Sequence, residues 1–164
     1  RPWAIPGTAH HEHRIGGLEK ENITGTVSHN PENHHQMVSL RAQKIKNITQ
    51  IIPPSKTYGK ESGDVLVVGW GSTFGAIHQA VENMNHHGFQ VGGLHLRHLN
   101  PLPSDLHDVF KRYKKILLPE NNMGQLSLKL RAEYLLPIES FNRVTGLPLK
   151  ISEIEGKLHQ MLGE

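Results

Sequence analysis

A glycine-containing turn after a short apolar run is the first place where this sequence could bind a ligand. Residues 65–68 are Val-Leu-Val-Val, which is typical of a strand buried on both faces. Residues 69–75 follow as Gly-Trp-Gly-Ser-Thr-Phe-Gly and lead into a helical pattern. A phosphate or carboxylate resting on the helix start at Gly71, Ser72 and Thr73 is one interpretation of this turn. A turn that serves only the passage from strand to helix is the interpretation that we favour.

The same turn is compared with the dinucleotide-binding fingerprint Gly-x-Gly-x-x-Gly. Its glycine spacing is one residue too long for that motif. The fingerprint also requires an acidic residue at the end of the next strand, where this sequence has Arg97 and His98. An independent nucleotide-binding domain of Rossmann type is therefore an alternative function, and not the preferred one.

Histidines form a second group of candidate ligands. Six of the thirteen histidines lie between residues 10 and 35, including the run His-His-Glu-His at 10–13 and the pair His34 and His35. Neither group has the His-Glu-x-x-His spacing that places two imidazoles on one helix face. His95 and His98 are expected on opposite faces of an extended strand. A polar surface or a subunit contact is favoured over an intrinsic metal site, and a histidine-rich metal or interaction module remains an alternative.

Residues 118–125, Leu-Pro-Glu-Asn-Asn-Met-Gly-Gln, form the third candidate. They follow an expected strand, at the edge of an open α/β sheet where ligands and partners collect. Glu120 and Asn122 could hold charge or bind a neighbouring backbone, and a capped strand-to-helix turn is an equally good interpretation. The sequence offers no nucleophile–base–acid set and no paired carboxylates, so we predict no catalytic residues.

Composition excludes several classes of function. The chain has 164 residues and no cysteine, which excludes disulfides, thiolate nucleophiles and cysteine-ligated zinc or iron–sulfur clusters. The net charge is +3, and the basic cluster at residues 111–115 suits a solvated helix end better than nucleic acid. No apolar run approaches the length of about 20 residues that spans a bilayer. We expect a soluble, cytoplasmic protein without nucleic-acid or membrane partners.

The elements that would position these residues fall into two parts. Residues 1–54 are expected to form an extended arm and a linker helix from Pro31 to about Ile48, capped by Asn30. The apolar residues of this helix form only a rough stripe. Residues 55–164 are expected to form the domain proper. A domain separated from its natural partners exposes apolar surface, so a homodimer is also expected.

Strands alternate with helices in residues 55–164, which indicates a parallel or mostly parallel sheet with helices on both faces. Strands are expected at residues 57–61, 65–68, 90–96, 116–118 and 138–141. Helices are expected after a Ser72 cap, after a Ser104 cap, over 124–135, and after a capping box of Ser152 and Glu155. All four helices are expected to carry buried faces. These are formed, in chain order, by Phe74, Ile77, Val81 and Met84; by Leu106, Val109, Phe110 and Tyr113; by Leu126, Leu130 and Tyr134; and by Ile154, Leu158 and Met161.

Taken together, these segments resemble the alpha subunit of 2-oxoacid:ferredoxin oxidoreductases, most closely the C-terminal part of the 2-oxoglutarate type. The resemblance begins with Arg-Pro-Trp-Ala-Ile-Pro-Gly at residues 1–7, continues through residues 13–20 and 30–34, and covers nearly the whole chain. Its later part is similar to the transketolase C-terminal type of domain. The motifs there are Val67 to Ser72, Leu99-x-Pro-Leu-Pro, Pro119 to Leu126, Gly146-x-Pro148 and Glu153-Ile154.

The resemblance implies a three-layer α/β/α domain with a mostly parallel, five-stranded sheet whose strand near 57–61 is antiparallel. It also implies that the intact enzyme decarboxylates a 2-oxoacid, with 2-oxoglutarate favoured. Such an enzyme uses thiamine diphosphate, magnesium, an iron–sulfur cluster and coenzyme A, and it passes electrons to ferredoxin. The thiamine site then lies between the preceding domain of the alpha subunit and the beta subunit. This segment is expected to bind none of these cofactors and to support subunit assembly as a non-catalytic domain.

Candidate interface residues follow from that implied role. The arm would pass close to the subunit interface, with His13, Arg14 and Glu19 in contact with partner subunits or lining the approach to the active site. At the end of the third expected strand of the domain core, Glu120, Asn122 and Gln125 are further interface candidates.

Overall fold

The structure is a computed structural model that describes residues 4–13 and 15–163. The chain forms two compact units, Arg1–Ile51 and Ile52–Glu164, whereas the sequence placed the boundary after residue 54. Arg14, one of the predicted interface residues, lies outside the described residues. Among the described residues no helix is long and apolar enough to cross a membrane.

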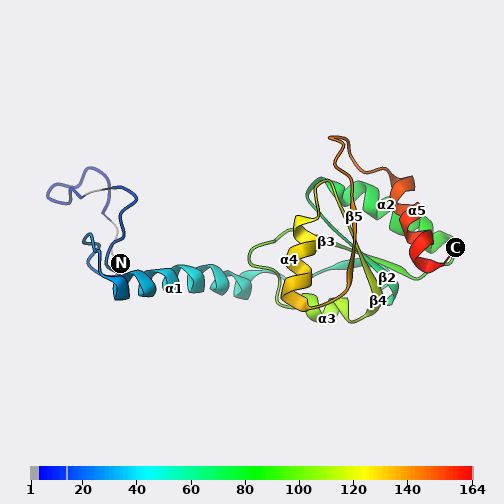
Figure 1. The fold of residues 1–164 in the computed structure, drawn as a ribbon, viewed down its shortest axis with the longest axis horizontal. Coiled ribbons are helices and arrows are strands. Elements are labelled where there is room, and N and C mark those ends of the chain that lie inside the picture. Colours follow the sequence, from blue (N-terminus) through cyan, green and yellow to red (C-terminus); the bar gives the residue numbers. More distant parts are fainter. Residues whose placement is uncertain (1–3, 14, 164) are drawn as a thin grey trace. The chain divides into compact units, whose positions relative to one another are not determined.

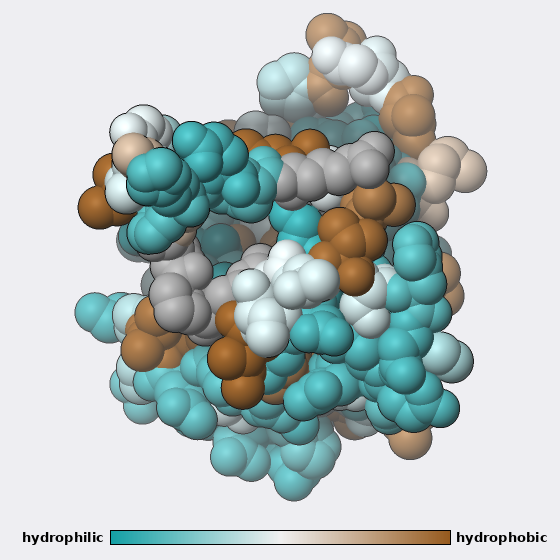
Figure 2. Space-filling view, turned by 90° about the vertical axis from the view of Figure 1, so that its left-hand side faces the viewer, coloured by the Kyte–Doolittle hydropathy of each residue, from teal (hydrophilic) through white to brown (hydrophobic). Residues whose placement is uncertain are grey.

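The first unit consists of an irregular arm, the helix α1 (Pro31–Asn47) and the 3-10 turn η1 (Ile48–Ile51). The Asn30 side chain accepts a hydrogen bond from the Asn33 amide at 2.8 Å, and Pro31 occupies the first turn, which confirms the predicted helix start. The structure describes all of α1, and each of its residues is exposed or half-buried. Hydrophobic residues reach the surface in separate patches among hydrophilic ones (Figure 2).

The second unit contains a five-stranded sheet within the described residues, in the order β1-β3-β2-β4-β5. β1 pairs with β3 in antiparallel orientation, and the β2–β3, β2–β4 and β4–β5 pairs are parallel, which confirms the mostly parallel sheet. Its strands are β1 (Thr57–Gly59), β2 (Gly63–Trp70), β3 (Val91–Leu96), β4 (Tyr113–Glu120) and β5 (Ile138–Asn142).

Helices cover both faces of this sheet (Figure 1). The helices α2 (Phe74–His86) and α5 (Ile151–Leu162) pack on one face, while α3 (Leu106–Phe110) and α4 (Gln125–Tyr134) pack on the other. Successive residues of a strand point to opposite faces, so Val65 and Val67 join the first core and Leu66 and Val68 join the second. All four side chains are fully buried, which confirms the interpretation of this run as a strand covered on both sides.

Three predicted helix starts differ from the structure. Ser72 is exposed within a 3-10 turn, η2 (Gly71–Thr73), and the Thr73 hydroxyl bonds to the Trp70 backbone instead. Asp105, and not Ser104, precedes α3. At α5 the Glu153 carboxylate accepts a hydrogen bond from the Lys150 amide at 3.1 Å, two residues before the predicted box. In each case the observed helix start lies one or two positions from the predicted one, so the sequence pattern predicted the helix but not the exact position of its first residue.

Two predicted core positions also differ. Phe74 is 46% exposed, because it stands at the first residue of α2, where the helix has only begun to approach the sheet. Tyr113 is buried as expected, but it opens β4 and does not extend α3. Its hydroxyl donates a hydrogen bond to the Lys60 carbonyl at 2.6 Å. A side chain at the end of a short helix and one at the start of a strand can satisfy the same spacing.

Candidate functional site

The glycine turn after β2 is built mainly for close packing. A Cβ on Gly69 would lie 2.5 Å from Ile77 Cδ1 and 2.8 Å from Thr73 Oγ1, so only glycine lets α2 start this close to the strand. Gly71 has φ +58°, and Gly71 and Ser72 are exposed, whereas Thr73 is buried and bonded to Trp70. The Gly71–Ser72–Thr73 anion site therefore stays a prediction, and the close packing favours the structural interpretation of the turn.

Glu120 was predicted as an interface residue, and the structure places its side chain in the interior. It is fully buried at the end of β4. Oε1 accepts hydrogen bonds from Leu126 N at 3.1 Å, Asn122 Nδ2 at 3.1 Å and Trp70 Nε1 at 3.3 Å, and Oε2 accepts one from Ser127 N at 3.0 Å. Two of these donors are free amides of the first turn of α4, where a negative charge is stabilised. The burial of Glu120 therefore argues against a direct contact with a partner and favours a role in holding the strand end to the helix.

Asn122 organises the loop between β4 and α4. Its Oδ1 accepts hydrogen bonds from Gly124 N at 2.7 Å and Gln125 N at 3.2 Å. Gly124 has φ +90°, and a Cβ there would meet Asn142 Nδ2 at 2.9 Å, so glycine is required for two reasons. Gln125 is exposed, and Met123 beside it is 76% exposed. Of the three interface candidates in this segment, Gln125 is the one whose side chain is presented at the surface.

Glu19 of the arm contacts α1 in the first unit. Its carboxylate receives hydrogen bonds from Arg41 Nη1 and Nη2 at 3.0 and 3.3 Å, and it lies 2.6 Å from His34 Nδ1. The hydrogen bonds from Arg41, and secondarily from His34, lower the pKa of Glu19 to about 2. His13 is exposed, and its Nδ1 lies 2.9 Å from the His11 carbonyl. Glu19 therefore has partners within its own unit, while His13 presents its ring to the surroundings.

The histidines do not gather into a metal-binding group within the part of the chain that the structure describes. This finding covers the runs at 10–13 and 34–35 as well as the later pair. His95 and His98, predicted on opposite faces of a strand, instead line one cleft. β3 ends at Leu96, so the alternation of an extended strand on which the prediction was based does not reach residue 98.

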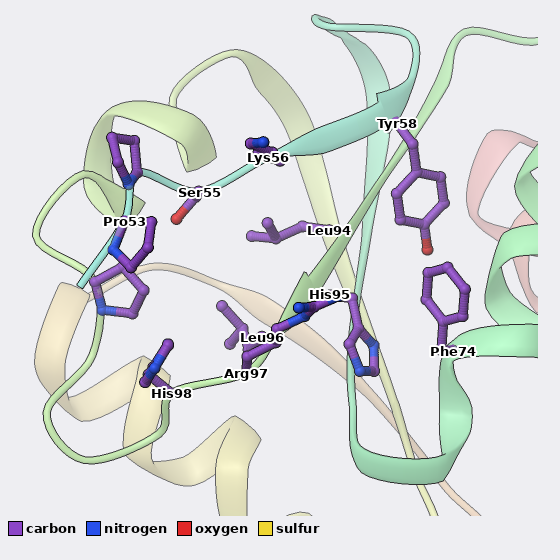
Figure 3. Close-up of a pocket in the computed structure, with 12 residues that line it drawn as sticks. Pro53, Ser55, Lys56, Tyr58, Phe74, Leu94, His95, Leu96, Arg97 and His98 are labelled. Atoms are coloured by element: carbon purple, nitrogen blue, oxygen red, sulfur yellow. The ribbon is translucent and has the colours of Figure 1, made fainter.

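This cleft, of about 580 Å³, lies beside the antiparallel edge of the sheet (Figure 3). One wall comes from the end of β3, a second from the segment that leads into β1, and a third from the start of α2. Figure 3 shows Tyr58, Phe74 and His95 gathered toward one end in that view, with Pro53, Ser55 and His98 toward the other. The lining consists of Pro53, Pro54, Ser55, Lys56, Tyr58, Phe74, Leu94, His95, Leu96, Arg97, His98 and Pro103.

Aromatic rings form one corner of the cleft. The Phe74 ring meets Tyr58 edge-on at a centroid distance of 5.9 Å and His95 edge-on at 5.2 Å, and His78 lies 4.9 Å from Tyr58. Tyr58 crosses the glycines of β3, since a Cβ on Gly93 would come within 2.2 Å of the tyrosine ring. Desolvation, and secondarily the charge of Arg97, lowers the pKa of His95, while burial raises the pKa of Tyr58.

Sequence reasoning missed this cleft. Arg97 and His98 were noted only as residues that occupy the place of a ribose-binding acid. Lys56, Tyr58 and Phe74 come from two other segments, and only the antiparallel pairing of β1 with β3 brings them to the same edge. The signal that could have found them is the pair of glycines in β3, because a large side chain from a neighbouring element often fills such a gap.

Curated relatives of the chain are alpha subunits of 2-oxoacid oxidoreductases. The chain is 43% identical over 156 residues to the 2-oxoglutarate oxidoreductase subunit KorA of Mycobacterium tuberculosis. This alignment covers 94% of this chain and 23% of that protein. It is 29% identical to the 2-oxoglutarate synthase subunit KorA of Methanocaldococcus jannaschii, over 94% of this chain and 39% of that protein. The chain thus spans about a quarter to two fifths of the length of these relatives.

Solved structures show the same fold. The 2-oxoglutarate:ferredoxin oxidoreductase from Magnetococcus marinus, with 2-oxoglutarate, coenzyme A and succinyl-CoA bound, matches 98% of this chain and 28% of its own chain. The TM-score is 0.87 at 29% identity. A split-gene transketolase, an inactive beta4 tetramer, matches 68% of this chain and 42% of its own with a TM-score of 0.53 at 16% identity, which shows a shared fold only.

The family comparison agrees with both results. Residues 63–154, more than half of the chain, match the family described as pyruvate:ferredoxin oxidoreductase core domain II. The matched residues contain β2 to β5 and the Glu120 network, and they confirm the resemblance seen in the sequence. The chain belongs to the pyruvate:ferredoxin oxidoreductase core domain II family.

Proposed function

We propose that this chain is a segment of the alpha subunit of a 2-oxoglutarate:ferredoxin oxidoreductase, and that it supports subunit assembly without supplying catalytic residues. The observation that carries this proposal is the 43% identity to a 2-oxoglutarate oxidoreductase subunit across 94% of the chain. The intact enzyme decarboxylates 2-oxoglutarate, transfers the acyl group to coenzyme A and passes electrons to ferredoxin in the cytoplasm. The beta subunit and the remainder of the alpha subunit are its structural partners.

The cofactors of this enzyme bind outside the segment. A chain without cysteine offers no thiolate ligands for an iron–sulfur cluster. Thiamine diphosphate and magnesium belong between the preceding domain of the alpha subunit and the beta subunit. The buried carboxylate of Glu120 already has four donors within the domain, which supports a structural role over an acid–base role.

We infer that two surfaces contact the partners. One is the arm, with His13, Arg14 and Glu19. The other is the loop after β4, where Gln125 is exposed and Asn122 fixes its backbone. The proposal also includes a homodimer, in which a second copy of the chain covers exposed apolar residues.

The test uses the full-length alpha subunit produced together with its beta partner. Coenzyme A-dependent reduction of a viologen dye is measured with 2-oxoglutarate and with pyruvate, and the present chain is assayed alone in parallel. Activity with 2-oxoglutarate in the complex and none in the chain alone is expected. Activity of the chain alone would contradict the non-catalytic role, and preference for pyruvate would contradict the proposed substrate.

Interface residues are tested in the same complex. Gln125→Ala and Arg14→Ala are each compared with Gln160→Ala, which changes an exposed residue of α5. We expect the first two variants to weaken association of the alpha and beta subunits, measured by sedimentation at several concentrations, while Gln160→Ala leaves it unchanged. Unchanged assembly and unchanged turnover in Arg14→Ala and Gln125→Ala would refute these contacts.

A further inference from the structure

Two buried polar atoms in the wall of the cleft have no hydrogen-bond partner. Within the described part of the chain, Tyr58 Oη and His95 Nδ1 are the buried side-chain polar atoms left without one. Both residues line the same cleft. Buried polar groups in native proteins are nearly always satisfied, so an exception needs an explanation such as a ligand that completes the site. The unpartnered Tyr58 hydroxyl makes this cleft the strongest candidate for an unassigned binding site, whereas the enclosed His95 Nδ1 bears on which ring nitrogen carries the proton.

The charge of the cleft selects the kind of ligand. Lys56 and Arg97 contribute permanent positive charges, and the twelve described lining residues include no aspartate or glutamate. Asp105 contacts the lining residue Ser55, and its two oxygens accept hydrogen bonds from Ser55 N at 2.7 Å and Ser55 Oγ at 2.8 Å. Glu82, behind the aromatic corner, lies 3.6 Å from His78 Nδ1. The free charges that face the cleft are therefore cationic.

His95 presents a neutral donor to the cleft. Burial and the neighbouring Arg97 lower the pKa of His95, so its ring is neutral at pH 7. Nδ1 is enclosed next to Gly69, where the described residues offer it no acceptor. An enclosed N–H without an acceptor is less tolerable than an enclosed lone pair, so the proton resides on Nε2. A neutral N–H donor beside a guanidinium is a suitable partner for an anionic oxygen.

Phe74 covers both unpartnered residues. Its ring lies against Tyr58 and against His95, and it is 46% exposed at the first turn of α2. Exposed side chains change rotamer within nanoseconds, and the proposal requires that this half-exposed ring turns aside. When it does, the Tyr58 hydroxyl becomes available as a second hydrogen-bond donor beside His95 Nε2.

We propose that this cleft binds a small organic anion through a carboxylate or phosphate group. Arg97 and Lys56 hold the charge, His95 Nε2 and Tyr58 Oη donate hydrogen bonds to its oxygens, and Leu94, Leu96 and the prolines contact its apolar part. A volume of about 580 Å³ lies within the range of small-molecule sites. The inference goes beyond the proposed function, because it holds whatever reaction the intact enzyme performs.

The first experiment titrates the 164-residue chain with inorganic phosphate, succinate and coenzyme A in separate arms. Binding is followed by calorimetry and by the ¹⁵N resonances of the His95 ring. We expect saturable binding in at least one arm, with a shift of the His95 Nε2 resonance. Phosphate and coenzyme A without succinate would identify a phosphate site, and succinate without phosphate a carboxylate site. No saturable binding in any arm would overturn the proposal, while the turnover assay above would remain a separate test of function.

Matched arginine variants locate the binding. Arg97→Gln removes a cleft charge, and Arg112→Gln removes an exposed charge just before β4, at the amino edge of the sheet. Arg97→Gln is expected to weaken binding about tenfold, the effect of one lost hydrogen bond to a charged group, and Arg112→Gln to leave it unchanged. Equal weakening by both variants would mean diffuse charge attraction and would overturn the site. A poly-glutamate peptide is titrated in a further arm. If this peptide alone shifts the His95 resonance, the cleft binds an acidic protein segment, and the proposal of a small-anion site is overturned.

Tyr58→Phe separates ligand binding from a structural role. Removal of a buried hydroxyl without a partner should raise the Tm of the free chain. The same change should weaken anion binding about tenfold, because the bound anion loses a donor. If Tyr58→Phe changes Tm but leaves the affinity for the anion unchanged, the hydroxyl has only a structural role and Tyr58 is not part of the site.

Discussion

The Glu120 carboxylate gives the sharpest test of how the carboxyl edge of the sheet is held together. Oε1 accepts three hydrogen bonds and Oε2 accepts one, from Ser127 N. In Glu120→Gln, the amide oxygen can take the place of Oε1, but the new NH₂ group then faces Ser127 N, also a donor. The Ser127 N–H and the new NH₂ group then both lack an acceptor there, and each unpaired buried donor should cost about 1–3 kcal/mol of unfolding free energy. Glu120→Ala leaves all four donors without the carboxylate and should cost about 3–5 kcal/mol.

Urea unfolding of the 164-residue chain, followed by far-ultraviolet circular dichroism, measures these differences. Glu133→Gln is the matched control, since Glu133 is exposed on α4 and should change stability by less than about 0.5 kcal/mol. Faster hydrogen exchange at the Leu126 and Ser127 amides should accompany both Glu120 variants. A Glu120→Gln chain as stable as wild type would refute the reasoning. A defect confined to assembly with the beta subunit would restore Glu120 to the interface role that its burial argues against.

Three further predictions concern other contacts. The pKa of Glu19 in the folded chain, about 2, lies below its ordinary value of 4.5. The arm–helix contact should therefore persist above pH 4.5 and be lost as the pH falls toward 2; a Glu19 carboxyl ¹³C titration with a midpoint near 4.5 would contradict it. Gly93→Ala should cost about 1–3 kcal/mol because its Cβ would meet the Tyr58 ring, whereas Gly75→Ala, which meets open space in α2, should stabilise by about 0.5–1 kcal/mol in the same urea assay. Asp105→Ala should cost about 1–2 kcal/mol of unfolding free energy, because both hydrogen bonds from Ser55 are lost. Asp105→Asn should lose less, because the Ser55 hydroxyl can accept a hydrogen bond from the new amide instead of donating one. Equal losses in the two variants would contradict this geometry.

The order of strands and helices could be predicted because the burial of one or both faces of an element gives its apolar residues a regular spacing in the sequence. The run from Val65 to Val68 is apolar without interruption, as a strand between two cores requires, and the structure buries it completely. The helices after it carry apolar residues at helical spacing, and most of these lie in the cores. The parallel pairing then follows from the helices that connect successive strands.

The site was less predictable because its contacts join distant parts of the chain. Trp70 and Glu120 are 50 residues apart, and their hydrogen bond depends on the adjacency of β2 and β4. Glu120 was predicted to hold charge, to bind a neighbouring backbone or to lie at an interface, and nothing in its own segment indicates that it is fully buried. The cleft needs the antiparallel β1, whose register with β3 sets Tyr58 opposite Gly93. Neither arrangement has a periodic signature within one segment.

The strand order explains why the cleft lies at the edge of the sheet and not at its centre. In the sheet, β3 lies on one side of β2 and β4 lies on the other, and α2 and α4 cover opposite faces. The order in which successive strands are added therefore reverses between β2 and β4. Open α/β sheets commonly bind ligands in the crevice at the carboxyl ends of two such strands. Here the hydrogen bond from Trp70 Nε1 to Glu120, with Asn122 beside it, spans these two strand ends. Because the protein's own side chains occupy that crevice, the domain is suited to holding a rigid edge for assembly, and a ligand is left with the cationic space beside β3.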